Sequence, residues 1–252
     1  MRTGCVAAFL AVAGFGSAHG IGLYVEPAPW HDAAYVDTTL AFVTGATAFT
    51  GDGRATLFDL GMAPIRRGPV RLAITWSYVF QRSTAIQSWG VGDPKIHARV
   101  SLPLLRRIRT GFFLEAAARL PVAQAELFPY AFGGQDITVM AVFDLGHGAL
   151  TFGAGRQFTE PPSDSNLGSE DLPHATSLWL QLSRPLGALT GQLRVDGLLF
   201  DLESHRRMVL EARLVHAPSS QRLSLRFVAK AETGHDRIFD FGGQIGFVAL
   251  TK

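Results

Sequence analysis

The sequence has a single cysteine among its 252 residues, Cys5, which lies close to the N-terminus. A chain that loses its first residues as a signal would hold no cysteine, which excludes an internal disulfide, a thiolate nucleophile and a thiolate metal site. Charged residues are also scarce, at 17%, against about 25% in an ordinary soluble domain. The formal net charge is only +2, with Lys and Arg dispersed, so we expect no nucleic-acid partner.

Long apolar runs are missing too, apart from one near the N-terminus. Residues 5–16 (CVAAFLAVAGFG) form this run, which is shorter than the ~20 residues of a membrane-spanning helix. Arg2 precedes it and small residues follow it up to Gly20. This order is typical of a secretory signal peptide, with a retained anchor helix as the alternative. We predict that residues 1–20 are removed and that residues 21–34 form a periplasmic tail or a plug in the lumen.

What the chain does contain is a repeated alternation of apolar and polar residues. In residues 94–102 the two sets take every second position, with Ile96, Ala98, Val100 and Leu102 against Lys95, His97, Arg99 and Ser101. A period of two places the sets on opposite faces of a β-strand. About twelve such segments, each near the ~10 residues of a tilted membrane strand, centre on 35–44, 54–64, 69–81, 92–103, 110–121, 136–146, 149–158, 174–184, 188–200, 206–216, 221–231 and 237–249.

The connections between these segments point to a barrel. They are short after the even-numbered segments and longer after the first, third, fifth and seventh, as in a barrel with periplasmic turns and longer outer loops. We therefore predict an all-β fold, a closed antiparallel transmembrane β-barrel of about twelve strands over residues 35–252, in the cell outer membrane. A soluble β-sandwich, which also alternates but buries its apolar face, is the rival.

Aromatic residues near strand ends or on the apolar face are expected to form interfacial girdles. These are Trp76, Tyr78, Trp89, Phe112, Phe128, Tyr130, Phe143 and Trp179. The polar face of the strands should then line a water-filled lumen, because isolated charges are costly in hydrocarbon. The expected lumen residues are Lys95, His97, Arg99, Glu115, Arg119, Arg194, Asp196, Arg207, Glu211, Arg213, Arg222, Arg226 and Lys230.

Two arrangements of these charges are open. In one, a cationic strip on one wall faces an acidic wall, as in a polar pore that orients solutes. The strip would hold Arg207, Arg213, Arg222, Arg226 and Lys230, and the acidic wall Asp37, Asp59, Glu115, Asp136 and Asp144. In the other, the charges neutralise one another in a network that plugs and stiffens the barrel.

Residues 90–103 (GVGDPKIHARVSLP) and 111–122 (GFFLEAAARLPV) resemble the outer-membrane family named "MetA-pathway of phenol degradation". The shared pattern is Gly-x-Gly-Asp opening a strand, then a turn, then a strand ending in an apolar-Pro pair. The resemblance implies a transporter for hydrophobic or aromatic compounds. Two features depart from the family: Val122-Ala123 follows Pro121 where the family continues Thr-Gly, and the chain ends ALTK without a terminal Phe.

We therefore expect a channel or transporter for small molecules, with outer-membrane lipids, a small-molecule solute and the barrel-assembly machinery as partners. The alternatives are a non-conducting structural or adhesion barrel and an outer-membrane lipid hydrolase. Ser204-His205 is the nearest candidate for a hydrolase dyad, although neighbours in sequence seldom align for proton transfer. We predict no enzyme and no cofactor. We also predict no metal site, since no HxxxH or HExxH spacing occurs.

Gly90-Val91-Gly92-Asp93 lacks the third Gly of a phosphate loop and is expected to be a bulge or a loop leading into a strand.

Overall fold

The computed structural model describes residues 40–50, 53–67, 69–83, 87–102, 110–146, 148–162, 166, 172–202, 205–216, 223–234 and 238–251. The predicted signal peptide and the 21–34 segment lie outside the described residues, and so does Arg222. Within the described residues, no helix combines the length and the apolarity needed to cross a membrane as a helix.

Thirteen strands in the described part form one antiparallel sheet. Their bounds are β1 Leu40–Thr50, β2 Gly53–Arg67, β3 Val70–Ser83, β4 Gln87–Val91, β5 Lys95–Leu102, β6 Thr110–Arg119, β7 Gln135–Leu145, β8 Leu150–Glu160, β9 Ala175–Leu186, β10 Leu189–Phe200, β11 Arg206–His216, β12 Leu223–Gly234 and β13 Phe241–Thr251. One 3-10 helix, η4 (Ala125–Leu127), lies between β6 and β7.

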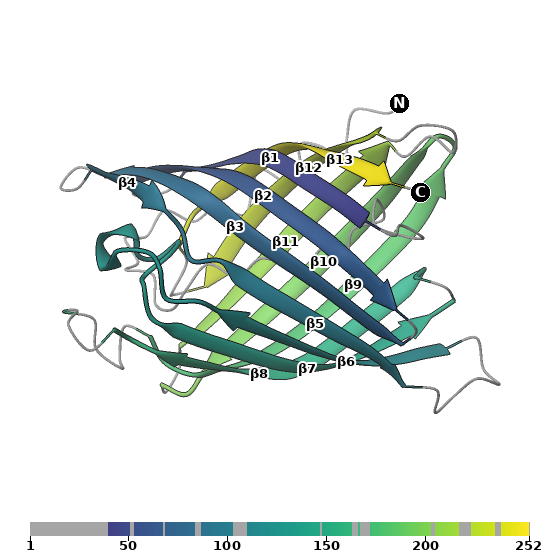
Figure 1. Ribbon diagram of the computed structural model, residues 1–252, viewed down its shortest axis with the longest axis horizontal. Coiled ribbons are helices and arrows are strands. Elements are labelled where there is room, and N and C mark those ends of the chain that lie inside the picture. The colour runs from purple at the N-terminus through teal and green to yellow at the C-terminus, as the bar shows by residue number, and fades with distance from the viewer. Residues whose placement is uncertain are drawn as a thin grey trace.

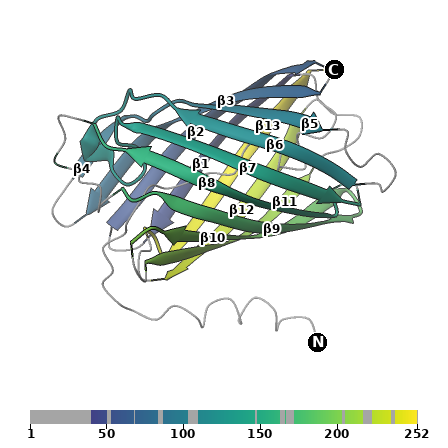
Figure 2. The ribbon, with the colours of Figure 1, turned by 90° about the horizontal axis from the view of Figure 1, so that it is seen from below.

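The strand pairing runs around the molecule. Consecutive strands pair from β5 to β13, β13 pairs with β1, β1 with β2, and β2 with β3. Both β4 and β5 pair with β3, at different parts of its length, so the thirteen strands fill twelve positions. Figures 1 and 2 show the sheet curving round, with β1 to β5 on one side and β8 to β12 on the other. The predicted antiparallel all-β architecture with about twelve strands is confirmed.

The predicted first strand, 35–44, was misplaced: β1 runs from Leu40 to Thr50, and only residues 51 and 52 separate it from β2. The long outer loop predicted after this segment is therefore wrong. The prediction failed because small residues such as Gly45 and Ala46 weaken the alternation. Backbone pairing does not need large side chains, and Gly45 pairs with Asp59 on β2 and Gly246 on β13.

From β6 to β10 the connections are short at one end of the sheet and long at the other, as predicted. A short glycine turn follows β9, where Gly187 has φ +70°, and another follows β7, where Gly146 has φ +65°. These angles favour glycine because it lacks a Cβ. At the other end, residues 120–134 connect β6 to β7, and residues 161–174 connect β8 to β9.

Candidate functional site

One face of the strands exposes apolar side chains. Phe58, Ile137, Leu180 and Phe227 are 56%, 47%, 44% and 48% exposed. They alternate with buried residues along their strands. A β-sandwich would bury this face, and Phe227 in particular would lie between two sheets. The exposure of this face excludes the sandwich and matches the lipid-facing surface of a membrane barrel.

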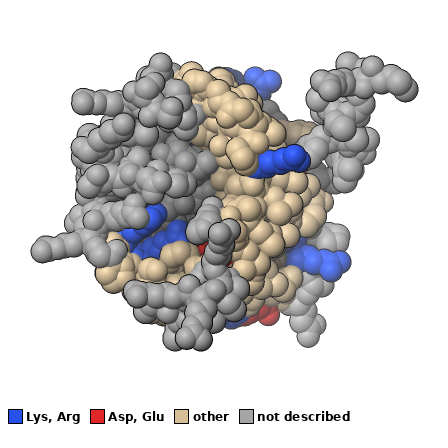
Figure 3. Space-filling view, turned by 90° about the vertical axis from the view of Figure 1, so that its right-hand side faces the viewer, with Lys and Arg blue, Asp and Glu red and all other residues tan. Residues whose placement is uncertain are grey.

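Most exposed charges on this outer face lie at the ends of the strands, and Arg156, four residues from the end of β8, pairs with the exposed Asp201. Arg54, Arg82, Arg184 and Arg206 are all exposed, and each lies within two residues of the end of its strand. Figure 3, a view onto one end of the molecule, shows separate Lys and Arg side chains on the outside of the visible surface and a group of them in a recess. This distribution leaves an apolar band along the middle of the strands, which is the pattern that a bilayer requires.

The opposite, inner face holds buried charge. Of the thirteen side chains predicted to line a lumen, eleven are buried, Asp196 is half-buried, and Arg222 lies outside the described residues. The eleven are Lys95, His97, Arg99, Glu115, Arg119, Arg194, Arg207, Glu211, Arg213, Arg226 and Lys230. Buried charges are retained only where they find partners, because leaving water is costly for an ion.

A first cluster centres on Asp136 of β7, which is fully buried. Its Oδ2 lies 3.4 Å from Lys95 Nζ and 3.3 Å from Arg119 Nε. Register explains the contact, since Arg119 lies directly opposite both Lys95 on β5 and Asp136 on β7. Arg99 and Glu115, which also lie opposite each other, form a neighbouring pair with 3.5 Å between Nε and Oε1.

A second cluster centres on Glu211 of β11. Its carboxylate pairs with Arg213 on the same strand and with Lys230, whose Nζ lies 3.2 Å from Oε2. Lys230 is the register partner of Glu211 on β12, and Arg194 is its partner on β10. Arg194 itself pairs with Asp196, with 2.6 Å between Nη2 and Oδ1. Glu211 thus has a cation on its own strand and one on each adjacent strand.

A third contact ties an inner ion pair to a connection between strands. Arg207 Nε lies 2.8 Å from Glu232 Oε1, and both side chains are buried. The other oxygen of Glu232 accepts hydrogen bonds from the backbone N–H groups of Ile238 (2.7 Å) and Phe239 (3.0 Å). Sequence reasoning missed this role of Glu232. Glu232 lies on the same face of β12 as Lys230 and Arg226 by the period of two, and this spacing could have predicted that it faces inward.

The prediction of a cationic strip facing an acidic wall is wrong for the described residues. Glu211 and Glu232 lie among the cations of β11 and β12, and Glu115 and Asp136 pair with cations from neighbouring strands. The physical reason is that facing side chains on adjacent strands are only about 5 Å apart, so opposite charges pair locally. The described charges instead form local ion pairs, as in the alternative in which they neutralise one another.

The girdle prediction is wrong for Trp179 and Tyr130. Trp179 is only 4% exposed, and the guanidinium carbon of Arg194 lies 4.1 Å from its ring centroid. The indole packs over Gly153, where an added Cβ would lie 2.4 Å from its Nε1. Tyr130 is also buried, and burial raises the pKa of its phenol, with the nearby Glu232 carboxylate adding to the effect.

Little in the described residues resembles a catalytic or metal centre. His97 contacts Thr75, with 3.0 Å between Nε2 and Oγ1. Ser204 of the candidate hydrolase dyad lies outside the described residues, and the His205 backbone N–H donates to the Leu202 carbonyl. In the part of the chain that the structure describes, no group of three or more His, Cys, Asp or Glu side chains could hold a metal ion.

The twelve-position sheet, with an apolar outer face and a charged inner face, has the fold of an outer-membrane β-barrel. An outer-membrane channel from Pseudomonas putida F1 has a similar structure, with a TM-score of 0.61 and 12% identity over 90% of this chain and 100% of that chain. The NanC porin is similar with a TM-score of 0.58 and 9% identity, over 84% and 100% of the two chains. No family model and no curated protein sequence matches the chain. Membership of the phenol-degradation family therefore stays a prediction.

Proposed function

We propose that this chain forms a closed barrel in the outer membrane and conducts small solutes through its interior. The observation that carries the proposal is the opposite character of the two faces, apolar outside and charged inside. Pairing of β1 with β13 and of β2 with β3 supports closure. The similar folds of a channel and a porin support conduction. Lipids of the outer membrane, the solute and the barrel-assembly machinery are the proposed partners.

The proposal predicts discrete steps of current when the purified protein is added to a planar lipid bilayer. The same preparation should migrate faster on a gel before boiling than after it, because a folded barrel resists unfolding by the detergent. A boiled sample is the control and should give no steps. A folded, heat-modifiable protein that gives no current under any voltage would favour the structural barrel. Release of fatty acid from phospholipid would favour the hydrolase.

The charge of the inner face predicts a preference for anions. Eight Lys and Arg side chains are buried in the described part, against five Asp and Glu. An excess of positive charge along a narrow path attracts anions and repels cations. In a gradient of potassium chloride, the reversal potential should therefore have the same sign as the equilibrium potential of chloride. The variant Arg226→Glu should reduce the size of this potential. A wild-type reversal potential with the sign of the potassium equilibrium potential would contradict the prediction.

A further inference from the structure

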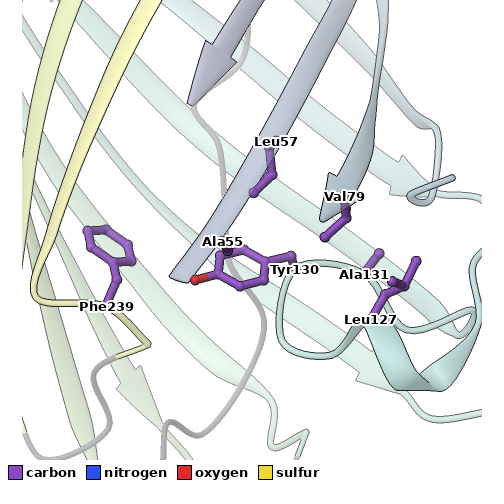
Figure 4. Packing of buried hydrophobic residues seen from close by; sticks show 7 residues of the cluster. All are labelled: Ala55, Leu57, Val79, Leu127, Tyr130, Ala131 and Phe239. Carbon is purple, nitrogen blue, oxygen red and sulfur yellow. The ribbon is translucent and has the colours of Figure 1, made fainter. Parts of the chain in front are cut away.

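The connection between β6 and β7, residues 120–134, folds into the interior instead of extending away from it. Leu127 of η4 is 1% exposed and Tyr130 is 9% exposed. Both pack in one apolar cluster with Leu57 on β2 and Val79 on β3, and Phe239 joins the cluster from the β12–β13 connection. Figure 4 shows these side chains converging from both sides. The cluster therefore joins the β6–β7 connection to β2, β3 and the β12–β13 connection.

Asp93 holds this β6–β7 loop in place. The residue lies between β4 and β5 and is 6% exposed. Its Oδ1 accepts hydrogen bonds from the N–H groups of Val122 (3.0 Å) and Ala123 (2.7 Å). Its Oδ2 accepts from Phe132 (2.9 Å) and Gly133 (3.1 Å). One carboxylate thus fastens both ends of the loop, and hydrogen bonds to a charged acceptor are the strong ones.

The backbone of the loop is shaped for this contact. Gly133 has φ +72°, and a Cβ at this position would lie 2.1 Å from the Ala123 carbonyl oxygen. Only glycine allows the two ends of the loop to approach so closely. Two features of the sequence could have indicated this arrangement. One is the acid in the Gly90-Val91-Gly92-Asp93 motif, and the other is the set of three aromatic residues in a predicted outer loop, Phe128, Tyr130 and Phe132.

A second set of contacts fastens the middle of the loop to the wall. Gln81 Nε2 donates to the carbonyl of Glu126 (2.5 Å) and to that of Phe128 (3.3 Å). Ser88 Oγ on β4 also donates to the Glu126 carbonyl, at 2.9 Å. The side chain of Glu126 is exposed. The loop therefore lies against the inner face of β3 and β4 and presents Leu127 and Tyr130 to the interior.

We propose that the β6–β7 loop is the constriction of this channel and that Asp93 is the residue that positions it. The inference rests on the proposed channel function. A dry apolar constriction resists the passage of water and ions, so conduction requires the loop to move. The Asp93 carboxylate sets how often the loop moves, because it accepts four backbone hydrogen bonds, two from each end of the loop.

The direct test compares Asp93→Asn with Glu126→Gln in planar bilayers. Both variants remove one negative charge, but only the first weakens the contacts that hold the loop. An asparagine oxygen can still accept from one pair of N–H groups, whereas its NH₂ group cannot accept from the other pair. Each hydrogen bond to a charged group is worth roughly tenfold in an equilibrium constant, so losing two should raise the ratio of open to closed time by about 100-fold. Glu126→Gln should behave as the wild type.

A second measurement follows the loop without relying on current. Leu127→Cys places a thiol in the buried cluster, where it should react slowly with a water-soluble maleimide followed by mass spectrometry. Adding Asp93→Asn should speed the reaction by the same factor as the open-to-closed ratio. The chain without the new cysteine is the control for Cys5. Should Asp93→Asn fail to give a heat-modifiable barrel, Gln81→Leu removes the second set of contacts and should change both readouts in the same direction.

The possible outcomes distinguish a failure of the constriction proposal from a failure of the proposed channel function. Unchanged current and unchanged thiol reactivity in Asp93→Asn would overturn the constriction while leaving the channel standing. Faster thiol reaction with no current from any variant would show that Asp93 positions the loop, and would overturn both the channel and its gating. A rise in both readouts for Glu126→Gln as well would assign the effect to charge and overturn the role of Asp93.

Discussion

Replacing Asp136 by Ala is expected to lower the free energy of unfolding by about 3–5 kcal/mol, the loss typical of removing one partner from a buried ionic contact. Asp136 is fully buried and lies within 3.4 Å of the Lys95 ammonium and the Arg119 guanidinium. The substitution leaves both cations without this carboxylate. The measurement is the urea midpoint of the protein folded into lipid vesicles, followed by gel mobility.

Glu160→Ala is the matched control, because Glu160 is an exposed acid at the end of the adjacent strand β8. Its effect should stay within about 0.5 kcal/mol, as for most surface substitutions. Adding Lys95→Met to Asp136→Ala should recover part of the loss, since one of the two buried cations that contacted Asp136 is then removed. An Asp136→Ala protein as stable as the wild type would show that water, and not the carboxylate, solvates these cations.

Leu180→Arg is expected to destabilise the folded protein by about 2–4 kcal/mol, the cost of an arginine on the lipid face at the middle of a bilayer. Leu180 lies near the centre of β9, is 44% exposed, and is the register partner of Phe152 and Val195 on the adjacent strands. An arginine at this position would place its guanidinium in hydrocarbon. The same urea titration in vesicles measures the effect.

The matched control is Leu186→Arg at the end of the same strand, where the leucine is 53% exposed. Near the interface the cost of an arginine falls to about 0–1 kcal/mol. The difference between the two variants reports depth in the membrane, because the substitution is identical. Equal effects at the two positions would mean that the outer face of β9 does not contact lipid.

The period of two was enough to define the strands and to separate their two faces. Ile96 and Val100 lie on the exposed face of β5, whereas Lys95, His97 and Arg99 are buried on the other. This succeeded because successive side chains of a strand must point to opposite sides, whatever the strand pairs with. It failed for β1, whose small residues carry little alternation, so that the strand was placed about five residues too early and a long loop was expected after it.

The sequence by itself determined the fold class, the approximate number of strands and the side of most strands that holds charge, because these follow from local geometry and polarity. The tertiary structure decided the rest. Register placed Glu211 beside Lys230 and Arg119 beside Asp136, so a cation of the expected strip and an acid of the expected wall each have a partner of opposite charge on an adjacent strand. It also brought Asp93 to the backbone of residues 122–133. Such contacts depend on how distant segments align, and no pattern within one segment contains that information.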